Sequence, residues 1–201
     1  DPIELSHYQF EAFFQPSAYL SGDWYDYWQV NDDEVLFYLA DVSGHGVTSS
    51  LLTSWMAAFH GRAKSPSELI HKLNAMLVQE NIEKHITMAA GILNLRSNEI
   101  CWSSAGHYPP PIIFEPNQAP QILTTSSFPL GLTEDLEVEE HRCVLNPHAR
   151  FILCSDGALE PYDGGLNDQF DQLLEHLQND SFHPPHHVAD DIAILSLRRM
   201  N

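Results

Sequence analysis

Basic residues are scarce in this sequence. Its 201 residues include 9 Lys or Arg against 28 Asp or Glu, which gives a formal net charge of −19. Nucleic acids and anionic membranes are bound through basic surfaces that neutralise phosphate groups. The composition therefore argues strongly against DNA, RNA or a membrane surface as the main partner.

Long apolar runs and an even number of cysteines are also missing. No apolar run approaches the ~18 residues that a membrane-spanning helix needs. The three cysteines, Cys101, Cys143 and Cys154, cannot all pair with one another, and none lies in a CxxC motif. A reduced protein in the cytoplasm is the simplest interpretation.

What the sequence does contain is enough apolar material for a core, since 43% of its residues are hydrophobic. A length of 201 residues fits one domain. The chain starts at Asp1-Pro2 without a methionine. We therefore expect residues 1–201 to be a single domain cut from a longer protein.

Strand patterns dominate, with two neighbouring helices between them. Asn31-Asp32-Asp33 separates two aromatic and aliphatic runs, which predicts a hairpin. Ser65-Pro66 predicts a helix start, and the helix before it is apolar around most of its surface, so we expect it to be buried. The grouping predicts an α+β fold with sheet packed on sheet and helices outside. Predicted strands cover residues 8–14, 24–30, 34–42, 87–95, 100–104, 111–114, 121–124, 137–144, 150–154 and 192–197, and predicted helices cover 47–63, 67–82 and 166–177.

Most acidic residues, such as those in 134–140, are expected to be solvated surface. Asp23, Asp41, Asp156 and the pair Asp190-Asp191 differ, because each lies at the end of a strand pattern or beside glycine. A carboxylate at the end of a buried strand is costly unless a cation or donor meets it. Taken singly, each of these residues is more typical of a turn or helix cap. As a set they predict a site for a hard divalent cation.

Six motifs follow one another along the chain: SGDWYD (21–26), DVSGHG (41–46), SAGH (104–107), FPLGL (128–132), CSDGALE (154–160) and DDIAIL (190–195). Their order resembles the PPM-type metal-dependent serine/threonine protein phosphatases, and most of all their bacterial SpoIIE/RsbU branch. The similarity runs from about Phe10 to Leu197. It implies an α-β-β-α sandwich, in which two antiparallel sheets pack face to face with antiparallel helix pairs outside.

This resemblance implies a centre of two Mn²⁺ or Mg²⁺ ions. The ions would share a water that attacks the phosphorus of a phosphoserine or phosphothreonine. Asp41 would bridge them, and Asp191 is the fallback should Asp190 not be the ligand. The implied ligands are Asp23, Asp41, the backbone carbonyl of Val42, Asp156 and Asp190.

The histidines leave alternatives open. His45 could protonate the leaving seryl oxygen, or it could simply pack within its loop. His107 is expected to bond to backbone rather than to a metal. His183, His186 and His187 resemble a metal tract, but the prolines between them favour an exposed loop.

The resemblance also implies a partner. In this branch the substrate is a phosphorylated anti-anti-sigma factor in a partner-switching pathway, and the domain follows a receiver or sensor module. A homodimer through a preceding segment would fit that arrangement. Two alternatives stay open: a pseudo-phosphatase that docks a partner without turnover, and a metal-dependent hydrolase of small phosphate esters.

Overall fold

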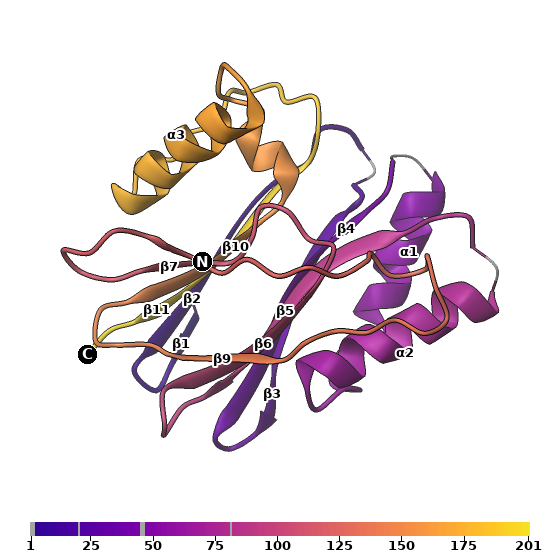
Figure 1. The fold of residues 1–201 in the computed structure, drawn as a ribbon, viewed down its shortest axis with the longest axis horizontal. Coiled ribbons are helices and arrows are strands. Elements are labelled where there is room, and N and C mark those ends of the chain that lie inside the picture. The colour runs from indigo at the N-terminus through magenta and orange to yellow at the C-terminus, as the bar shows by residue number, and fades with distance from the viewer. Residues whose placement is uncertain (1–2, 20, 45–46, 81) are drawn as a thin grey trace.

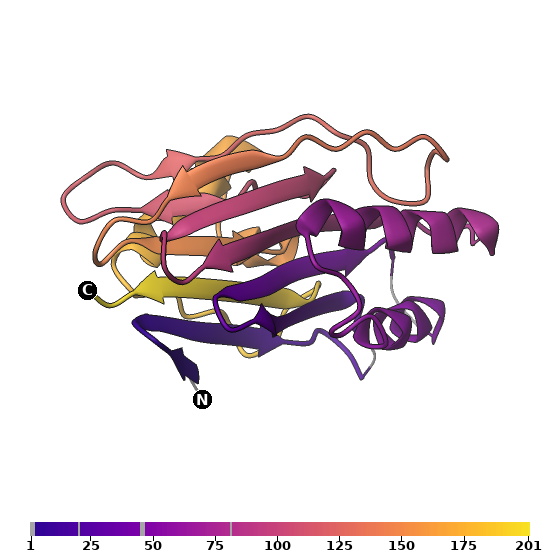
Figure 2. The ribbon, with the colours of Figure 1, turned by 90° about the horizontal axis from the view of Figure 1, so that it is seen from below.

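The computed structural model describes residues 3–19, 21–44, 47–80 and 82–201. Within these ranges the strands form two sheets, of six and five strands, and every pairing between named strands is antiparallel. The two sheets lie face to face as the central layers of the molecule (Figure 2). The predicted α+β sandwich is confirmed.

The five-stranded sheet contains the predicted hairpin. In spatial order its strands are β3 (Asp23–Asn31), β4 (Glu34–Val42), β5 (Ile86–Asn94), β6 (Glu99–Ala105) and β9 (His141–Val144). The last strand is shorter than predicted, because residues 137–140 have no ladder pairing.

The six-stranded sheet joins the two ends of the chain. The C-terminal strand lies between the strand near the N-terminus and the strand that precedes the SDG motif, so residues far apart in sequence become neighbours. Its spatial order is β1 (Ile3–Leu5), β2 (Tyr8–Gln15), β11 (Ile192–Arg199), β10 (Arg150–Cys154), β7 (Ile112–Phe114) and β8 (Gln121–Ile122).

An apolar core fills the space between the sheets. Phe37 of β4 meets Phe151 of β10 edge to face, with ring centroids 5.6 Å apart. Phe10 of β2 stacks on Tyr27 of β3 at 5.2 Å. Aromatic contacts of this kind add to the burial energy and fix how one sheet lies on the other.

Helices cover both outer faces, as Figure 1 shows. The helices α1 (Val47–Ala57) and α2 (Pro66–Gln79) pack on the five-stranded sheet, and α3 (Leu166–Gln178) packs on the six-stranded sheet with the short 3₁₀ turn η1 (Asp156–Leu159). The expected helix pair is therefore found on one side, whereas the described residues place a single α-helix on the other. No helix in the described ranges is long and apolar enough to cross a bilayer.

The first helix differs from its prediction in length and burial. It ends at Ala57, and residues 58–62 continue as turns with bonds such as Ala58 N to Trp55 O at 2.9 Å. Leu51 and Trp55 are 56% and 41% exposed, so the expectation that this helix is buried on most sides is wrong. The second helix starts as predicted, with the Ser65 hydroxyl accepting a hydrogen bond from Glu68 N.

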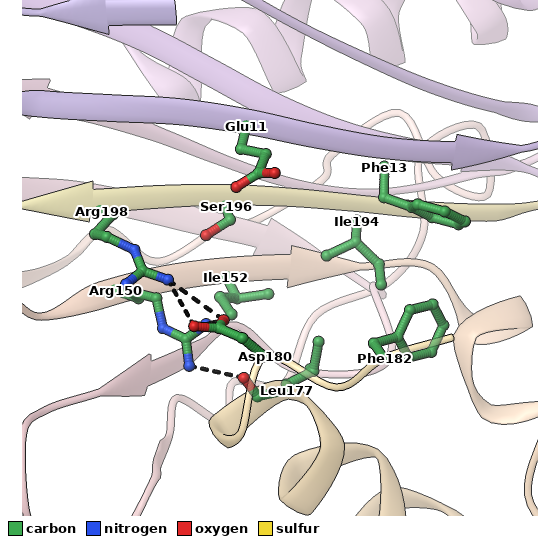
Figure 3. A pocket seen from close by; sticks show the side chains of 10 residues that line it. All are labelled: Glu11, Phe13, Arg150, Ile152, Leu177, Asp180, Phe182, Ile194, Ser196 and Arg198. Atoms are coloured by element: carbon green, nitrogen blue, oxygen red, sulfur yellow. Dashed lines mark hydrogen bonds and ion pairs between the residues drawn. The ribbon is translucent and has the colours of Figure 1, made fainter. Parts of the chain in front are cut away.

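A buried arginine fastens the C-terminal end of α3 to the sheet. Arg150 of β10 is 8% exposed, and its guanidinium pairs with Asp180 and donates to Leu177 O at 2.7 Å and Gln178 O at 3.2 Å. Arg198 reaches the same carboxylate at 3.0 Å from a more exposed position (Figure 3). Carbonyls at a helix end lack partners within the helix, so Arg150 supplies the donors they need.

We expect Arg150→Met to lower stability by about 2 kcal/mol, because the two carbonyls and Asp180 lose a buried donor. Arg198→Met, which removes a charge from the same carboxylate at the surface, should cost less than about 1 kcal/mol. Urea unfolding of both variants checks this. Equal effects of the two substitutions would contradict the anchoring role.

Candidate metal centre

Two of the predicted ligands face each other across a strand pair. Asp23 is the first residue of β3, Asp41 is the penultimate residue of β4, and the antiparallel register sets them directly opposite each other. Beside them, Val42 N donates to Gly22 O at 3.1 Å. Like charges opposite each other weaken a sheet, so this pairing costs stability unless something offsets it.

The other sheet brings its acidic loops to the same end. Asp156 opens η1 directly after β10, and the pair Asp190-Asp191 directly precedes β11. The two loops touch: a Cβ built on Gly157 would lie only 2.0 Å from Asp191 O. Only glycine allows this approach, which brings the SDG motif against the DDI motif.

The Asp191 carboxylate accepts four hydrogen bonds at this end of the sandwich. Its Oδ1 accepts hydrogen bonds from Ser17 N at 2.7 Å and from the Ser17 hydroxyl at 2.9 Å. Its Oδ2 accepts from the Ser21 hydroxyl and from Gly22 N, both at 2.7 Å. Although burial raises its pKa, these donors prevail and hold the pKa of Asp191 below its ordinary value. Asp191 therefore ties the start of β11 to the segment that leads into Asp23.

Asp190 has a different environment from its neighbour. Its side chain is exposed, while its backbone N–H and that of Ala189 donate to Glu160 Oε2 at 3.0 and 2.9 Å. Its own Oδ1 accepts a hydrogen bond from Asp191 N at 2.8 Å. The Asp190 carboxylate thus lies at the surface of this group of aspartates, and its oxygens can accept further ligands or hydrogen bonds.

Burial and mutual repulsion act strongly on the carboxylates of the hairpin. Burial raises the pKa of Asp23 to about 9; Ser155 partly offsets this, and the charges of Asp41, Asp191 and Asp156 add to it. Burial likewise raises the pKa of Asp41 to about 7, together with the charges of Asp156, Asp190 and Asp191. Residues from both sheets therefore interact electrostatically in one place.

Asp156 behaves in the same way. Burial first, and then the charge of Asp190, raise its pKa. Asp23, Asp41, Asp156, Asp190 and Asp191 thus interact electrostatically at one end of the sandwich, and this set is called the acidic cluster below.

The acidic cluster fits a hard divalent cation. Asp23 Oδ2 is buried and has no hydrogen-bond partner among the described residues. Val42 O, Gly44 O and Asp41 Oδ1 lie 3.0, 3.3 and 3.8 Å from the point that a Cβ on Gly22 would occupy, so a set of oxygens lines a space that a side chain would fill. Oxygen donors of this kind suit Mg²⁺ or Mn²⁺. In the described ranges, however, no three His, Cys, Asp or Glu side chains are already arranged to hold an ion.

The histidines discussed above differ in their surroundings. His45 lies outside the described residues. His107 is buried and meets Cys154 O at 3.0 Å and the Thr87 hydroxyl at 3.3 Å, and burial lowers its pKa to about 4. Its predicted backbone bond is confirmed. The residues His183, His186 and His187 lie in an exposed loop, as predicted.

Several positioning residues were not predicted. Ser21 and Glu160 lie inside the quoted motifs, but nothing in their spacing shows that one binds Asp191 and the other the backbone of Asp190. Ser17 lies outside every motif and is joined to Asp191 across 174 positions of sequence. These contacts depend on the pairing of β2 with β11, which no local pattern reveals.

Comparison with known proteins now identifies the chain. Residues 31–200 match the family described as Stage II sporulation protein E (SpoIIE). The chain belongs to the SpoIIE family. The resemblance drawn from the six motifs is confirmed.

Individual relatives agree with this family. The chain is 26% identical over 214 residues to the phosphoserine phosphatase RsbP of Bacillus subtilis (strain 168), covering 95% of this chain and 52% of RsbP. It therefore spans about half the length of that relative. Among solved structures, the RsbU and RsbW domains of Rv1364c from Mycobacterium tuberculosis match with a TM-score of 0.79 and 21% identity, over 96% of this chain and 60% of that one. RsbX in complex with magnesium matches with a TM-score of 0.73 and 15% identity, over 98% of each chain. These structures share the fold.

The raised pKa of Asp23 predicts how the metal-free protein responds to pH. Between its ordinary value of 3.8 and about 9, the folded chain holds a proton on Asp23 that the unfolded chain has lost. Stability contributed by this group is therefore lost as pH rises through this window. Asp23→Asn should remove that loss and, at pH 8 in EDTA, raise stability on the order of 2 kcal/mol, or roughly 4–8 °C in Tm.

Thermal unfolding of both proteins at pH 5 and pH 8 measures this effect, with the exposed turn variant Asp32→Asn as the control. The gain from Asp23→Asn should be larger at pH 8. A gain that is the same at both pH values, or a loss at pH 8, would be evidence that Asp23 is not a strained carboxyl.

Proposed function

We propose that this chain, over residues 1–201, is a single metal-dependent phosphatase domain that acts on phosphoserine or phosphothreonine in proteins. The observation that carries the proposal is the acidic cluster, in which burial and, after it, carboxylates from both sheets raise the pKa of Asp23 and Asp41, and in which Asp23 Oδ2 is buried without a hydrogen-bond partner among the described residues. A protein rarely buries interacting carboxylates without a functional reason. Membership of the SpoIIE family and likeness to RsbP support the same reading.

The proposed cofactor is a pair of Mn²⁺ or Mg²⁺ ions. Ions of this kind, when bound, supply a water of lowered pKa and offset charge on the phosphoryl oxygens. The donor set supports oxygen-preferring ions, and the magnesium complex of RsbX supports the choice by likeness of fold. The proposed ligands are Asp23, Asp41, the carbonyl of Val42, Asp156 and Asp190.

The chain's own residues would orient these donors. The four hydrogen bonds that Asp191 accepts support a positioning role for it, and they leave Asp190 as the better ligand of the pair. Glu160 would hold the Asp190 loop through two backbone N–H groups. His45, between two glycines of the same motif as Asp41, is the proposed donor of a proton to the leaving seryl oxygen, with loop packing as its alternative role.

The proposed substrate is a phosphorylated anti-anti-sigma factor, so that dephosphorylation would act in a partner-switching pathway in the cytoplasm. Three observations support this finer proposal. The relatives are phosphoserine phosphatases of the RsbP type, the net charge of −19 disfavours nucleic acid, and the three cysteines are free.

The proposal predicts activity that depends on both metal and Asp41. The chain should release phosphate from a phosphoserine peptide in Mn²⁺, and EDTA should abolish this release. Asp41→Ala should lower the rate at least 100-fold, because it removes the proposed bridging ligand, whereas Asp32→Ala, at an exposed turn, should leave it unchanged. Phosphate release with each protein, with and without metal, checks this.

Two other outcomes would each replace the proposal. Absence of turnover at every Mn²⁺ and Mg²⁺ concentration, with partner binding retained, would make the chain a pseudo-phosphatase. Hydrolysis of p-nitrophenyl phosphate without hydrolysis of phosphopeptides or phosphoproteins would make it a hydrolase of small esters.

The adjacent aspartates Asp190 and Asp191 should respond oppositely to substitution. Asp190→Ala should weaken Mn²⁺ binding, seen by titration calorimetry, with little change in unfolding. Asp191→Ala should instead lower stability, by about 1–3 kcal/mol for each buried donor left without a partner. If Asp191→Ala lost Mn²⁺ binding at unchanged stability, Asp191 would be the ligand and the assignment would reverse.

A further inference from the structure

Ser43, which follows the proposed ligands Asp41 and Val42, is bound on three sides by one short segment. Ser43 N donates to His85 O at 2.9 Å, and the Ser43 hydroxyl accepts from His85 N at 3.1 Å. The carbonyl of Ser43 accepts a hydrogen bond from Lys84 Nζ at 2.6 Å. All the polar groups of this residue are therefore held by residues that lead into β5.

These bonds fix two successive peptide planes. In a trans peptide the C=O points opposite to the N–H, so the bond from Ser43 N to His85 turns the carbonyl of Val42 to the other side. That side is the one facing Gly22, where Val42 O lies 3.0 Å from the Cβ position. The Lys84 bond then fixes the next plane, between Ser43 and Gly44.

Gly44, the next residue, lies against the Lys84 ammonium. Its φ of +70° lies in the left-handed region, where glycine is free to leave one conformation for another. A Cβ built on Gly44 would lie 2.9 Å from Lys84 Nζ. The Lys84 ammonium therefore fills the space that a side chain at position 44 would need. On its far side the Gly44 carbonyl accepts a hydrogen bond from the Ser49 hydroxyl of α1 at 2.8 Å.

The charge of Lys84 is also unusual in its setting. The chain has 9 Lys or Arg residues, and among those the structure describes, Lys84 alone is hydrogen-bonded to residues 41–44. A charged donor makes a stronger bond to a carbonyl than a neutral one. A bond of this strength is suited to holding a backbone beside repelling carboxylates.

We propose that Lys84 is a positioning residue of the metal centre: its ammonium, bonded to the Ser43 carbonyl, holds residues 42–44 so that the Val42 carbonyl stays directed toward a bound cation. The inference rests on the proposed function, since it assumes that this loop binds metal. It predicts an effect on metal affinity that is separate from any contact with substrate.

The test compares Lys84→Met with Lys84→Arg by Mn²⁺ titration calorimetry and by kcat and KM for a phosphoserine peptide. Lys84→Met keeps the length of the side chain and removes the donor, so Mn²⁺ affinity should fall roughly 10–100-fold, as for other residues that orient metal ligands. At saturating Mn²⁺ the KM should stay unchanged. Lys84→Arg retains a charged donor and should stay close to the unsubstituted chain.

Lys72→Met is a matched control, because Lys72 Nζ also donates to one backbone carbonyl, that of Arg62 at 2.7 Å, on the exposed face of α2. It should leave Mn²⁺ affinity unchanged. Should Lys84→Met fail to fold, Lys84→Gln, which removes the charge and shortens the side chain, takes its place, and unchanged Mn²⁺ affinity in that folded variant would overturn the proposal.

Three results would reject the role of Lys84. The first is unchanged Mn²⁺ affinity and unchanged Tm in Lys84→Met. The second is a lower Tm with unchanged Mn²⁺ affinity, which would mean that the bond only stabilises the fold. A change in KM at saturating Mn²⁺ with unchanged affinity would make Lys84 a substrate contact instead. Failure of the unsubstituted chain to bind Mn²⁺ or to turn over would reject the proposed function itself, which separates the two failures.

Discussion

Repulsion among carboxylates gathered around the buried Asp23 is the constraint on which this end of the molecule depends. Asp23 and Asp41 lie opposite each other in one sheet, and burial, followed by the charges of Asp156, Asp190 and Asp191 from the other sheet, raises the pKa of Asp41. A fold selected for stability alone would not keep these groups together. Their arrangement is understandable when a cation completes it, because positive charge turns the repulsion into binding energy.

The surrounding scaffold resists that repulsion with bonds between distant segments. Asp191 is the exception within the acidic set, since its donors stabilise its charge and lower its pKa. It joins the start of β11 to Ser17 and Gly22, while the backbone contact at Gly157 joins β11 to the loop after β10. These contacts hold the like charges of the acidic cluster together at this end of the sandwich.

How much of this arrangement could be predicted from sequence depends on the range of each interaction. The hairpin of β3 and β4 and the cap at Ser65 follow from local patterns, and both were predicted. The motif order also found the aspartates of the cluster. The end of α1 was missed, because apolar residues such as Trp55 continue the helical pattern while lying at the surface. That Asp191, rather than Asp190, accepts hydrogen bonds from Ser17 became visible only with the pairing of β2 and β11, which brings these segments together.

The scarcity of basic residues has a consequence for how a phosphate group could be met. Several cations of this chain form ion pairs away from the acidic cluster. Arg150 and Arg198 share Asp180 near the C-terminal end of α3, and Lys72 pairs with Glu68 on α2. Near the acidic cluster the described residues offer Lys84, and its ammonium is already bonded to the Ser43 carbonyl. A phosphate dianion approaching this surface would meet mainly carboxylates. Under the proposed function, charge compensation would come from bound ions, so the acidic residues that hold them would serve recognition of the phosphate as well as its hydrolysis.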